Sequence, residues 1–400
     1  MERIETLRME GVTRQYGSAT ALIDFTLDIQ GGTFTTLLGP SGCGKTTALN
    51  CLAGLLDVSA GTIQLNGRPI QHIPAEKRGF GLVFQNYALF PHLNVERNVG
   101  YGLEIRRVPR AERQRRIREA LAMVHLEDFG KRYPSQLSGG QQQRLAIART
   151  IVLRPDLLLM DEPLSNLDAN LRNEMRLEIK RIHTELNLTT VYVTHDQSEA
   201  MSLSDLVVVM RHGRIEQMGT PQEIYNRPRN LYVAGFMGYA NRLPGVLVER
   251  DGDAWVVETD EGLRLRGVAT SEQSAGWSAG MAVTLCFKAE ETLTEQPSSP
   301  NQISGQVRMV EYLGKVFEVV VQLAGTQGRT LLLHSRLLPE IGAQATFGIR
   351  PERLLIFPAE AEGQQSSASA KTETDSTKGG AAHVQRDTHQ AAPSAATPLE

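Results

Sequence analysis

The sequence is poor in cysteine and has no long hydrophobic run. Its 400 residues include 3 cysteines, Cys43, Cys51 and Cys286, with no CxxC pair. This number and spacing exclude a disulfide framework and a structural zinc site, and they favour a reducing compartment. No stretch reaches the roughly 20 apolar residues that a membrane helix needs, and residues 1–5 lack the apolar core of a signal peptide. We therefore expect a cytoplasmic protein.

The sequence also lacks an excess of charge of either sign. Lys and Arg number 42 and Asp and Glu 45, which gives a net charge of −3. Without a basic surface rich in aromatic residues, nothing points to nucleic acid or anionic lipid as a partner. Hydrophobic residues make up 41% and charged residues 22%, which is an ordinary globular composition. The length predicts two domains and a tail.

The periodicity of the sequence divides the chain into three parts. Residues 1–235 alternate short β-branched runs with helical periods, which predicts an α/β domain with a parallel sheet. Residues 236–358 contain short strands separated by turn residues and are predicted to form a small all-β domain. Residues 359–400 consist mostly of Ala, Ser, Thr, Gln, Glu and Gly. We expect them to form a disordered tail, because burial cannot offset the entropy lost on ordering them.

Three predicted strands lead directly into polar residues. They lie at residues 35–38, 157–160 and 190–193. Ligands of open α/β sheets bind beyond the carboxyl ends of the strands, so these positions are candidates for a site. Within the all-β part, residues 283–290 resemble residues 345–352. This weak repeat indicates two related halves, although a match of this length also arises by chance.

The strand at residues 35–38 is followed by a loop with the spacing GxxxxGK[ST]. Backbone N–H groups of such a loop hold phosphate oxygens, and the helix that follows, beginning near Ala48, adds its dipole. Lys45 would neutralise the β and γ phosphates, and Thr46 would bind Mg²⁺. Cys43 is interpreted as a small packing residue at a variable position of the loop. The predicted nucleotide-binding residues of the loop are Gly39, Pro40, Ser41, Gly42, Cys43, Gly44, Lys45, Thr46 and Thr47.

The strand at residues 157–160 ends in two adjacent carboxylates, Asp161 and Glu162. Successive side chains of a strand diverge, so Asp161 can reach Mg²⁺ while Glu162 faces the water that attacks the γ-phosphate. Alone, such a pair would more often mark the start of a loop. The phosphate loop upstream favours the catalytic interpretation.

A third motif opens a helical run. Ser138 is a favourable N-cap, but two glycines in the first turn cost stability unless another group approaches that backbone closely. One interpretation is a second phosphate-binding helix end that serves the nucleotide of another subunit. The other is a capped glycine turn. The motif consists of Leu137, Ser138, Gly139, Gly140 and Gln141.

Together these motifs resemble those of ABC-type ATPases, over residues 1–235. The run at residues 137–141 matches the family signature, and it precedes the two carboxylates at the family's spacing. The resemblance implies an aromatic residue that stacks on adenine, a Q-loop glutamine that also reaches Mg²⁺, a D-loop and a switch histidine. The matching residues are Tyr16, Gln85, Ser165, Asp168 and His195. The alternative is a turn aromatic for Tyr16, a solvated strand end for Gln85 and a structural histidine for His195.

The same resemblance implies a mechanism. Two ATPase subunits would form a head-to-tail homodimer, with ATP between the phosphate loop of one subunit and the signature of the other. Glu162 would polarise the attacking water, while Gln85 and His195 would hold the γ-phosphate, the water and Mg²⁺. The implied cofactors are ATP and Mg²⁺.

Two segments of the β part resemble a further domain. Residues 311–314 and 348–352 are similar to the transport-associated OB-like domain of maltose and polyamine importer ATPases, although residues 286–290 depart from its usual motif. This resemblance implies a place at the cytoplasmic face of the bacterial inner membrane. The implied partners are two integral-membrane permease subunits and an extracytoplasmic solute-binding protein that acts through the permease.

The solute is the least determined part of the prediction. Residues 239–244 differ from the Ser-Pro-x-Met-Asn-like segment of sugar-type relatives, which favours a polyamine-like or other small organic solute. Sugars, phosphonates and ferric iron remain open. A non-transport ABC ATPase is less favoured, because the second cassette, coiled-coil insertion or basic arm typical of such proteins is not found. A mainly regulatory module with ATP as a switch is a third reading.

Overall fold

The structure is a computed structural model and describes residues 4–270, 274, 276–293, 300–323 and 328–359. The predicted disordered tail, apart from residue 359, lies outside the described residues. Among the described helices, none combines the length and the apolar character required to cross a bilayer.

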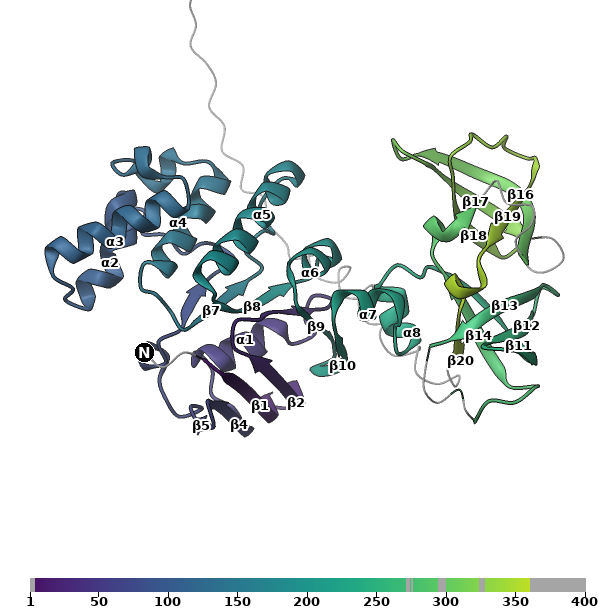
Figure 1. Cartoon of the computed structure of the whole chain (residues 1–400), viewed down its shortest axis with the longest axis horizontal. Coiled ribbons are helices and arrows are strands. Elements are labelled where there is room, and N and C mark those ends of the chain that lie inside the picture. The colour runs from purple at the N-terminus through teal and green to yellow at the C-terminus, as the bar shows by residue number, and fades with distance from the viewer. Residues whose placement is uncertain (1–3, 271–273, 275, 294–299, 324–327, 360–400) are drawn as a thin grey trace, which may run out of the picture. The chain divides into compact units, whose positions relative to one another are not determined.

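The first part of the chain is built on a six-stranded sheet in the order β10-β9-β3-β8-β7-β6 (Figure 1). Strands β9, β3, β8, β7 and β6 are parallel, and β10 is antiparallel to β9. Three of these strands confirm the predicted ones to within one residue at each end. The strands are β3 (Phe34–Leu38), β6 (Gly81–Val83), β7 (Leu157–Asp161), β8 (Thr189–Thr194), β9 (Leu206–Arg211) and β10 (Arg214–Gly219).

A four-stranded antiparallel sheet in the order β2-β1-β4-β5 packs over one face of this sheet through α1 (Lys45–Ala53). Its core joins Phe25 of β2 and Leu49 of α1 to Leu159 of β7. The apolar positions of the parallel strands alternate between the two faces, so each face carries its own core. The antiparallel strands are β1 (Thr6–Tyr16), β2 (Ala19–Gln30), β4 (Ala60–Leu65) and β5 (Arg68–Pro69).

Helices cover the other face. Figure 1 shows α2, α3 and α4 grouped together, with α5 beside the sheet. Tyr192 of β8 and Met175 of α5 belong to the core on this side. The helices are α2 (Val95–Ile105), α3 (Arg110–Met123), α4 (Gly139–Ile151), α5 (Ala169–Leu186), α6 (Gln197–Leu203), α7 (Pro221–Asn226) and α8 (Leu231–Phe236).

Two helix starts can be compared with the sequence. Helix α4 has Ser138 as its N-cap, as predicted, with a capping box to Gln141. Helix α1 begins at Lys45 rather than near Ala48. Gly44, in a left-handed conformation with φ 107°, turns the loop directly into the helix. The residues Lys-Thr-Thr carry no hydrophobic period, so the sequence pattern placed the start too late.

The second part is all-β, as predicted. It contains a closed barrel, β11-β12-β13-β20-β14, and a five-stranded sheet, β15-β19-β16-β17-β18, with a common hydrophobic core. The barrel strands are β11 (Asn241–Asp251), β12 (Ala254–Thr259), β13 (Arg264–Ala269), β14 (Ala282–Phe287) and β20 (Leu355–Pro358). The others are β15 (Thr292–Leu293), β16 (Asn301–Tyr312), β17 (Phe317–Leu323), β18 (Thr330–Ser335) and β19 (Gln344–Ile349).

The weak sequence repeat has a structural counterpart. In the first copy, β14 is followed by a 3₁₀ turn at Ala289–Glu291, and in the second, β19 is followed by a 3₁₀ turn at Pro351–Arg353. One copy lies in the barrel and the other in the second sheet. The two segments therefore have the same local form.

Candidate active site

The predicted catalytic residues meet at the carboxyl edge of the parallel sheet. In sheet order, β3 precedes the phosphate loop, β8 precedes His195, β7 ends in Asp161 and is followed by Glu162, and β6 precedes Gln85. Neighbouring strands lie about 4.8 Å apart. Four segments that are distant in the sequence therefore lie side by side at one edge.

The phosphate loop closes around the side chain of Lys45. Its Nζ donates hydrogen bonds to the carbonyl oxygens of Gly39, at 2.8 Å, and Pro40, at 2.9 Å, and the side chain is only 4% exposed. A Cβ on Gly44 would lie 2.6 Å from the carbonyl oxygen of Ala21, so a larger residue does not fit there. The loop thus presents a buried cation in the glycine-rich turn that the sequence predicted.

Thr46 and Asp161 form the next contact of the site. The Thr46 hydroxyl donates to Asp161 Oδ1 at 2.9 Å. Burial raises the pKa of Asp161, and the neighbouring Glu162 raises it further, whereas the Thr46 hydrogen bond and Lys45 lower it. A divalent cation would stabilise the charged carboxylate, and hydroxyl and carboxylate oxygens are ligands that Mg²⁺ accepts. These two residues therefore suit a magnesium ion.

Glu162 lies between the lysine and the histidine. Its Oε1 is 4.0 Å from Lys45 Nζ, and its Oε2 is 3.1 Å from His195 Nδ1. The backbone of Glu162 is left-handed, with φ 41°, and its N–H donates to the carbonyl oxygen of Val193 at 3.0 Å. Such conformations in residues other than glycine cluster at functional sites.

Gln85 and the D-loop are joined by hydrogen bonds. Gln85 Nε2 donates to Ser165 Oγ at 3.3 Å, and Ser165 Oγ donates to the carbonyl oxygen of Glu162 at 2.9 Å. Asn166 Nδ2 donates to the carbonyl oxygen of Gln85 at 3.0 Å. Asp168 instead caps α5 by accepting from two backbone N–H groups. The structure thus brings Gln85 and Ser165 together beside Glu162.

Tyr16 lies at the turn between β1 and β2. It is 45% exposed, and the guanidinium carbon of Arg14 lies 4.7 Å from its ring centroid. The contact of Ala21 with Gly44 places this hairpin next to the phosphate loop. Tyr16 is therefore an exposed aromatic residue of the hairpin that contacts the loop, and its ring can stack on a flat group.

The signature residues at 137–141 have their own surroundings. Gln141 Oε1 accepts from the backbone N–H of Ser138 at 3.0 Å. A Cβ on Gly140 would lie 2.7 Å from Leu171 Cδ1, whereas one on Gly139 would meet only Leu167 Cδ2, at 3.4 Å. Close packing against α5 thus explains Gly140 but not Gly139. No hydrogen bond found among the described residues links the signature to the phosphate loop.

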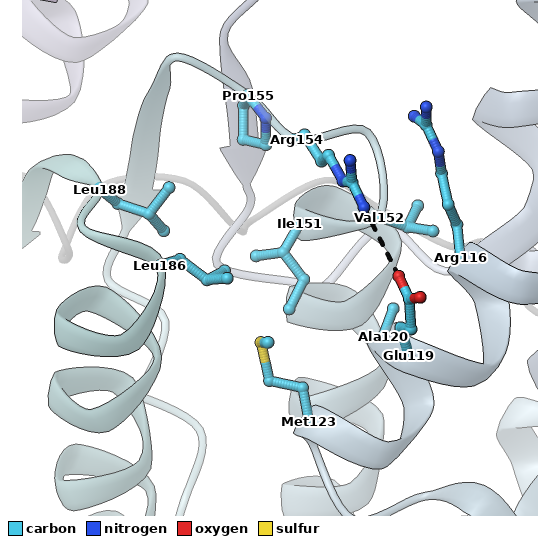
Figure 2. A pocket seen from close by; sticks show the side chains of 10 residues that line it. All are labelled: Arg116, Glu119, Ala120, Met123, Ile151, Val152, Arg154, Pro155, Leu186 and Leu188. Carbon is cyan, nitrogen blue, oxygen red and sulfur yellow. Dashed lines mark ion pairs between the residues drawn. The ribbon is translucent and has the colours of Figure 1, made fainter. Parts of the chain in front are cut away.

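Two residues at the site carried no prediction. Arg172 and Glu199 line a cavity of about 40 Å³ together with Glu162, Ser165 and His195. The sequence offered a signal for Glu199 alone, because an acidic residue lies there one helical turn after His195. A much larger cavity, about 360 Å³, contains no predicted site residue. Figure 2 shows its mainly apolar lining from α3, α4 and the end of α5, with an Arg154–Glu119 ion pair at one side.

Two segments of the chain match known protein families. Residues 22–165 match the family described as ABC transporter, and residues 291–357 match the TOBE domain. Three similar proteins illustrate the likeness. The spermidine/putrescine import ATP-binding protein PotA of Oleidesulfovibrio alaskensis is 46% identical over 332 residues, which is 81% of this chain and 88% of that protein. The Fe(3+) ions import ATP-binding protein FbpC of a strain of Escherichia coli is 42% identical over 360 residues, or 89% and 99%.

The third is a solved structure. That of cbiO1 from Clostridium perfringens, part of the ABC transporter complex cbiONQ, covers 56% of this chain and 91% of that one, with 29% identity and a TM-score of 0.52. The relatives extend over most of the described chain, and the matched families cover segments of both its α/β and its all-β part. The chain therefore belongs to the ATP-binding subunits of ABC transporters, as an ABC-type ATPase with a C-terminal TOBE domain.

Proposed function

We propose that this chain hydrolyses ATP to power a bacterial importer at the cytoplasmic face of the inner membrane. The main support is the position of Glu162, which lies 4.0 Å from the phosphate-loop cation of Lys45 and 3.1 Å from His195. The names of the relatives PotA and FbpC, both import ATP-binding proteins, support the direction of transport.

Each residue of the site has a separate role in ATP binding or hydrolysis. The phosphate loop binds the triphosphate, and Lys45 exchanges its bonds to Gly39 and Pro40 for the β and γ phosphates. Glu162 polarises the attacking water and holds its proton. His195 is oriented by Glu162 at Nδ1, which leaves Nε2 as the ring nitrogen that can bind the γ-phosphate. Tyr16 stacks on the adenine.

Thr46, Asp161 and Gln85 are the residues that would hold Mg²⁺. The ion would neutralise charge on the phosphate oxygens. All three side chains offer oxygen ligands, as Mg²⁺ prefers. Gln85 donates to Ser165 through its Nε2, so its Oε1 remains the atom for the ion. Thr46 would exchange its bond to Asp161 for the metal.

We further propose a head-to-tail homodimer. The exposed Gly139 at the start of α4 has no packing role within its own chain, which suits contact with the ATP of a partner subunit. In the assembled transporter this dimer would bind two integral-membrane permease subunits, and an extracytoplasmic solute-binding protein would act through them.

Glu162→Gln tests the catalytic assignment. The amide cannot take up a proton, so kcat for ATP hydrolysis should fall by about 100-fold or more while ATP binding is kept. Both are measured on the purified chain, by phosphate release and by titration with a fluorescent ATP analogue. Glu174→Gln, an exposed change on α5, is the matched control. Near-normal turnover in Glu162→Gln would contradict the assignment.

For the solute, we propose a polyamine-like or another small organic compound. The segment at residues 239–244 and the 46% identity to a spermidine/putrescine importer subunit support it. Ferric iron is the second candidate, because the FbpC match covers 99% of that protein.

Uptake in a deletion strain separates the two. The strain is complemented with the native chain or Glu162→Gln and given labelled spermidine, putrescine, ferric iron, a sugar or a phosphonate. We expect only polyamine uptake to be lost on deletion and restored by the native chain alone. Loss of iron uptake instead would show that ferric iron is the solute. Unchanged uptake of every solute would contradict both candidate solutes.

A further inference from the structure

A buried carboxylate lies behind the proposed switch histidine. Glu199 of α6 is 3% exposed, and its Oε2 accepts hydrogen bonds from the hydroxyls of Tyr192 and Thr194, each at 2.7 Å. Burial raises the pKa of Glu199, whereas the two hydroxyl donors and Arg172 lower it. A buried carboxylate with three such neighbours holds a fixed position.

This carboxylate holds Thr194, the residue before His195, and Thr194 in turn holds the residue after it. Thr194 Oγ1 donates to Glu199 and also accepts the backbone N–H of Asp196 at 3.0 Å. The carboxylate of Asp196 in turn accepts the backbone N–H of Ser198 at 2.7 Å and that of Glu199 at 3.1 Å. The residues before and after His195 are therefore tied to one another, while the imidazole, whose side chain is 53% exposed, faces the site.

Arg172 connects this arrangement to the D-loop. Its Nε lies 3.9 Å from Glu199 Oε1, and its Nη1 lies 3.8 Å from Asp196 Oδ2. Its Nη2 donates to the carbonyl oxygen of Leu167, within the D-loop, at 3.0 Å. One guanidinium thus lies near Asp196, the residue after His195, and also contacts the D-loop, and the rigid fork of arginine suits this bridging role.

We infer that Glu199 and Arg172 are positioning residues of the ATPase site. Glu199 sets the place of His195 through Thr194 and Asp196, and Arg172 couples that place to the D-loop. This inference rests on the proposed role of His195. Small displacements of a catalytic group cost large factors in rate, so the two residues act on turnover rather than on ATP affinity.

Kinetics of single and double variants test the role of Glu199. Glu199→Ala should lower kcat by about 10- to 100-fold with KM for ATP within about threefold of the native value. Glu199→Gln, which keeps an acceptor for the two hydroxyls, should restore most of kcat. In a His195→Ala background, Glu199→Ala should cause no further loss, because residues that act through one group are not additive. Losses that multiply would overturn the inference.

A spectroscopic measurement is used if ATP hydrolysis by His195→Ala is too slow for its kcat to be compared with that of the double variant. The ¹H–¹³C signal of His195 Cε1 is assigned by its disappearance in His195→Ala. It should move or broaden in Glu199→Ala, and an unmoved signal would overturn the inference. If Glu199→Ala does not fold, Thr194→Val, which breaks the same link with little change in volume, takes its place with the same expected results.

Glu178 provides a matched control. It is also a buried glutamate paired with an arginine, Arg181, at 2.7 Å, but it is not among the residues that line the site cavity. Glu178→Ala should lower stability without changing kcat or the His195 signal. If Glu178→Ala has the same effects as Glu199→Ala, the inference is wrong, because loss of stability alone would explain both.

The coupling of Arg172 to the D-loop is tested by the kinetics of single and double variants. Arg172→Met should lower kcat by about tenfold, and combination with Ser165→Ala should give less than the product of the two losses. Independent losses would contradict the coupling. If His195→Ala itself keeps normal turnover, the catalytic role proposed for His195 is wrong. If His195→Ala loses turnover but Glu199→Ala and Arg172→Met do not, only the inference about the positioning residues is wrong.

Discussion

At the scale of single residues, Glu162 combines the proposed chemistry with an unfavourable backbone. Its φ of 41° costs a residue with a Cβ on the order of 1–3 kcal/mol. The hydrogen bond from its N–H to Val193 and the contact of its side chain with His195 hold it there. The strain is thus local to the residue that faces the phosphate loop.

Glu162→Gly should therefore be more stable than Glu162→Ala, by about 1 kcal/mol, because glycine adopts left-handed conformations without a steric penalty. This order is the reverse of that usually found for the two residues. Both variants should lose ATP hydrolysis. Urea unfolding of the two purified variants measures the difference, and a more stable Glu162→Ala would show that the backbone is not strained there.

Tyr16 gives a second prediction at this scale. Stacking of a base on an aromatic ring contributes about 1–3 kcal/mol, so Tyr16→Ala should raise the dissociation constant for ATP by about fivefold or more. Tyr16→Phe keeps the ring and should bind ATP nearly as well as the native chain. Titration with a fluorescent ATP analogue measures both. Equal affinity for the alanine and phenylalanine variants would exclude stacking.

The sequence could predict individual residues where the chemistry is local. The phosphate loop, Ser138 as an N-cap and the carboxylates after a strand all follow from short motifs, and the structure places them accordingly. Arg172 and Glu199 could not be found this way. Their contacts join α5, β8 and α6, and only the folded chain brings these elements together.

At the scale of elements, Arg78 connects the end of α1 to the rest of the domain. It is 7% exposed, and its Nη1 donates to the carbonyl oxygens of Cys51, at 2.9 Å, and Leu52, at 2.7 Å. Its Nε and Nη2 donate to the carbonyl oxygens of Ile73 and Gln71. Burial lowers the pKa of Arg78, but these contacts and the dipole of α1 favour a cation there.

Arg78→Met should lower the free energy of unfolding by about 3 kcal/mol, because it leaves several buried carbonyl oxygens without a donor. The exposed Arg336→Met is the control and should change stability by less than about 0.5 kcal/mol. Urea unfolding measures both. A loss for Arg78→Met no larger than that of the control would show that water satisfies these carbonyl oxygens.

Helices and strands could be predicted where the hydrophobic pattern of the sequence is clear. Short apolar or β-branched runs identified β3, β7 and β8 to within one residue at each end. The start of α1 was misplaced because its first turn is polar and is set by Gly44. The pairing of β1 with β2 and β4, and the closure of the barrel, depend on contacts between distant strands, which periodicity alone does not determine.

At the scale of the whole molecule, the proposed dimer makes a prediction about Gly139. This residue is exposed, and a side chain there meets only Leu167, at 3.4 Å. Gly139→Asp should leave the fold and ATP binding intact. It should prevent the ATP-dependent dimer, because the added carboxylate would face the phosphates of the ATP bound to the partner subunit.

Sedimentation in the Glu162→Gln background measures this effect. With ATP and Mg²⁺, Glu162→Gln alone should sediment as a dimer, and the double variant as a monomer. The control is Glu174→Asp, an exposed acidic position on α5, which should leave the dimer unchanged. Dimers of the Gly139→Asp double variant would show that the signature does not face the partner.

The order of the strands has a further consequence. Strand β6 has three residues, ends the sheet and pairs only with β7, whereas β3, β7 and β8 each have neighbours on both sides. Among these four strands, the one that leads to Gln85 is therefore the least restrained, and local opening is cheapest at such an edge. Its amide hydrogens should exchange with solvent before those of β3, β7 and β8, and binding of nucleotide at Gln85 should slow them. Gln85 thus follows the strand that should open most readily among the four.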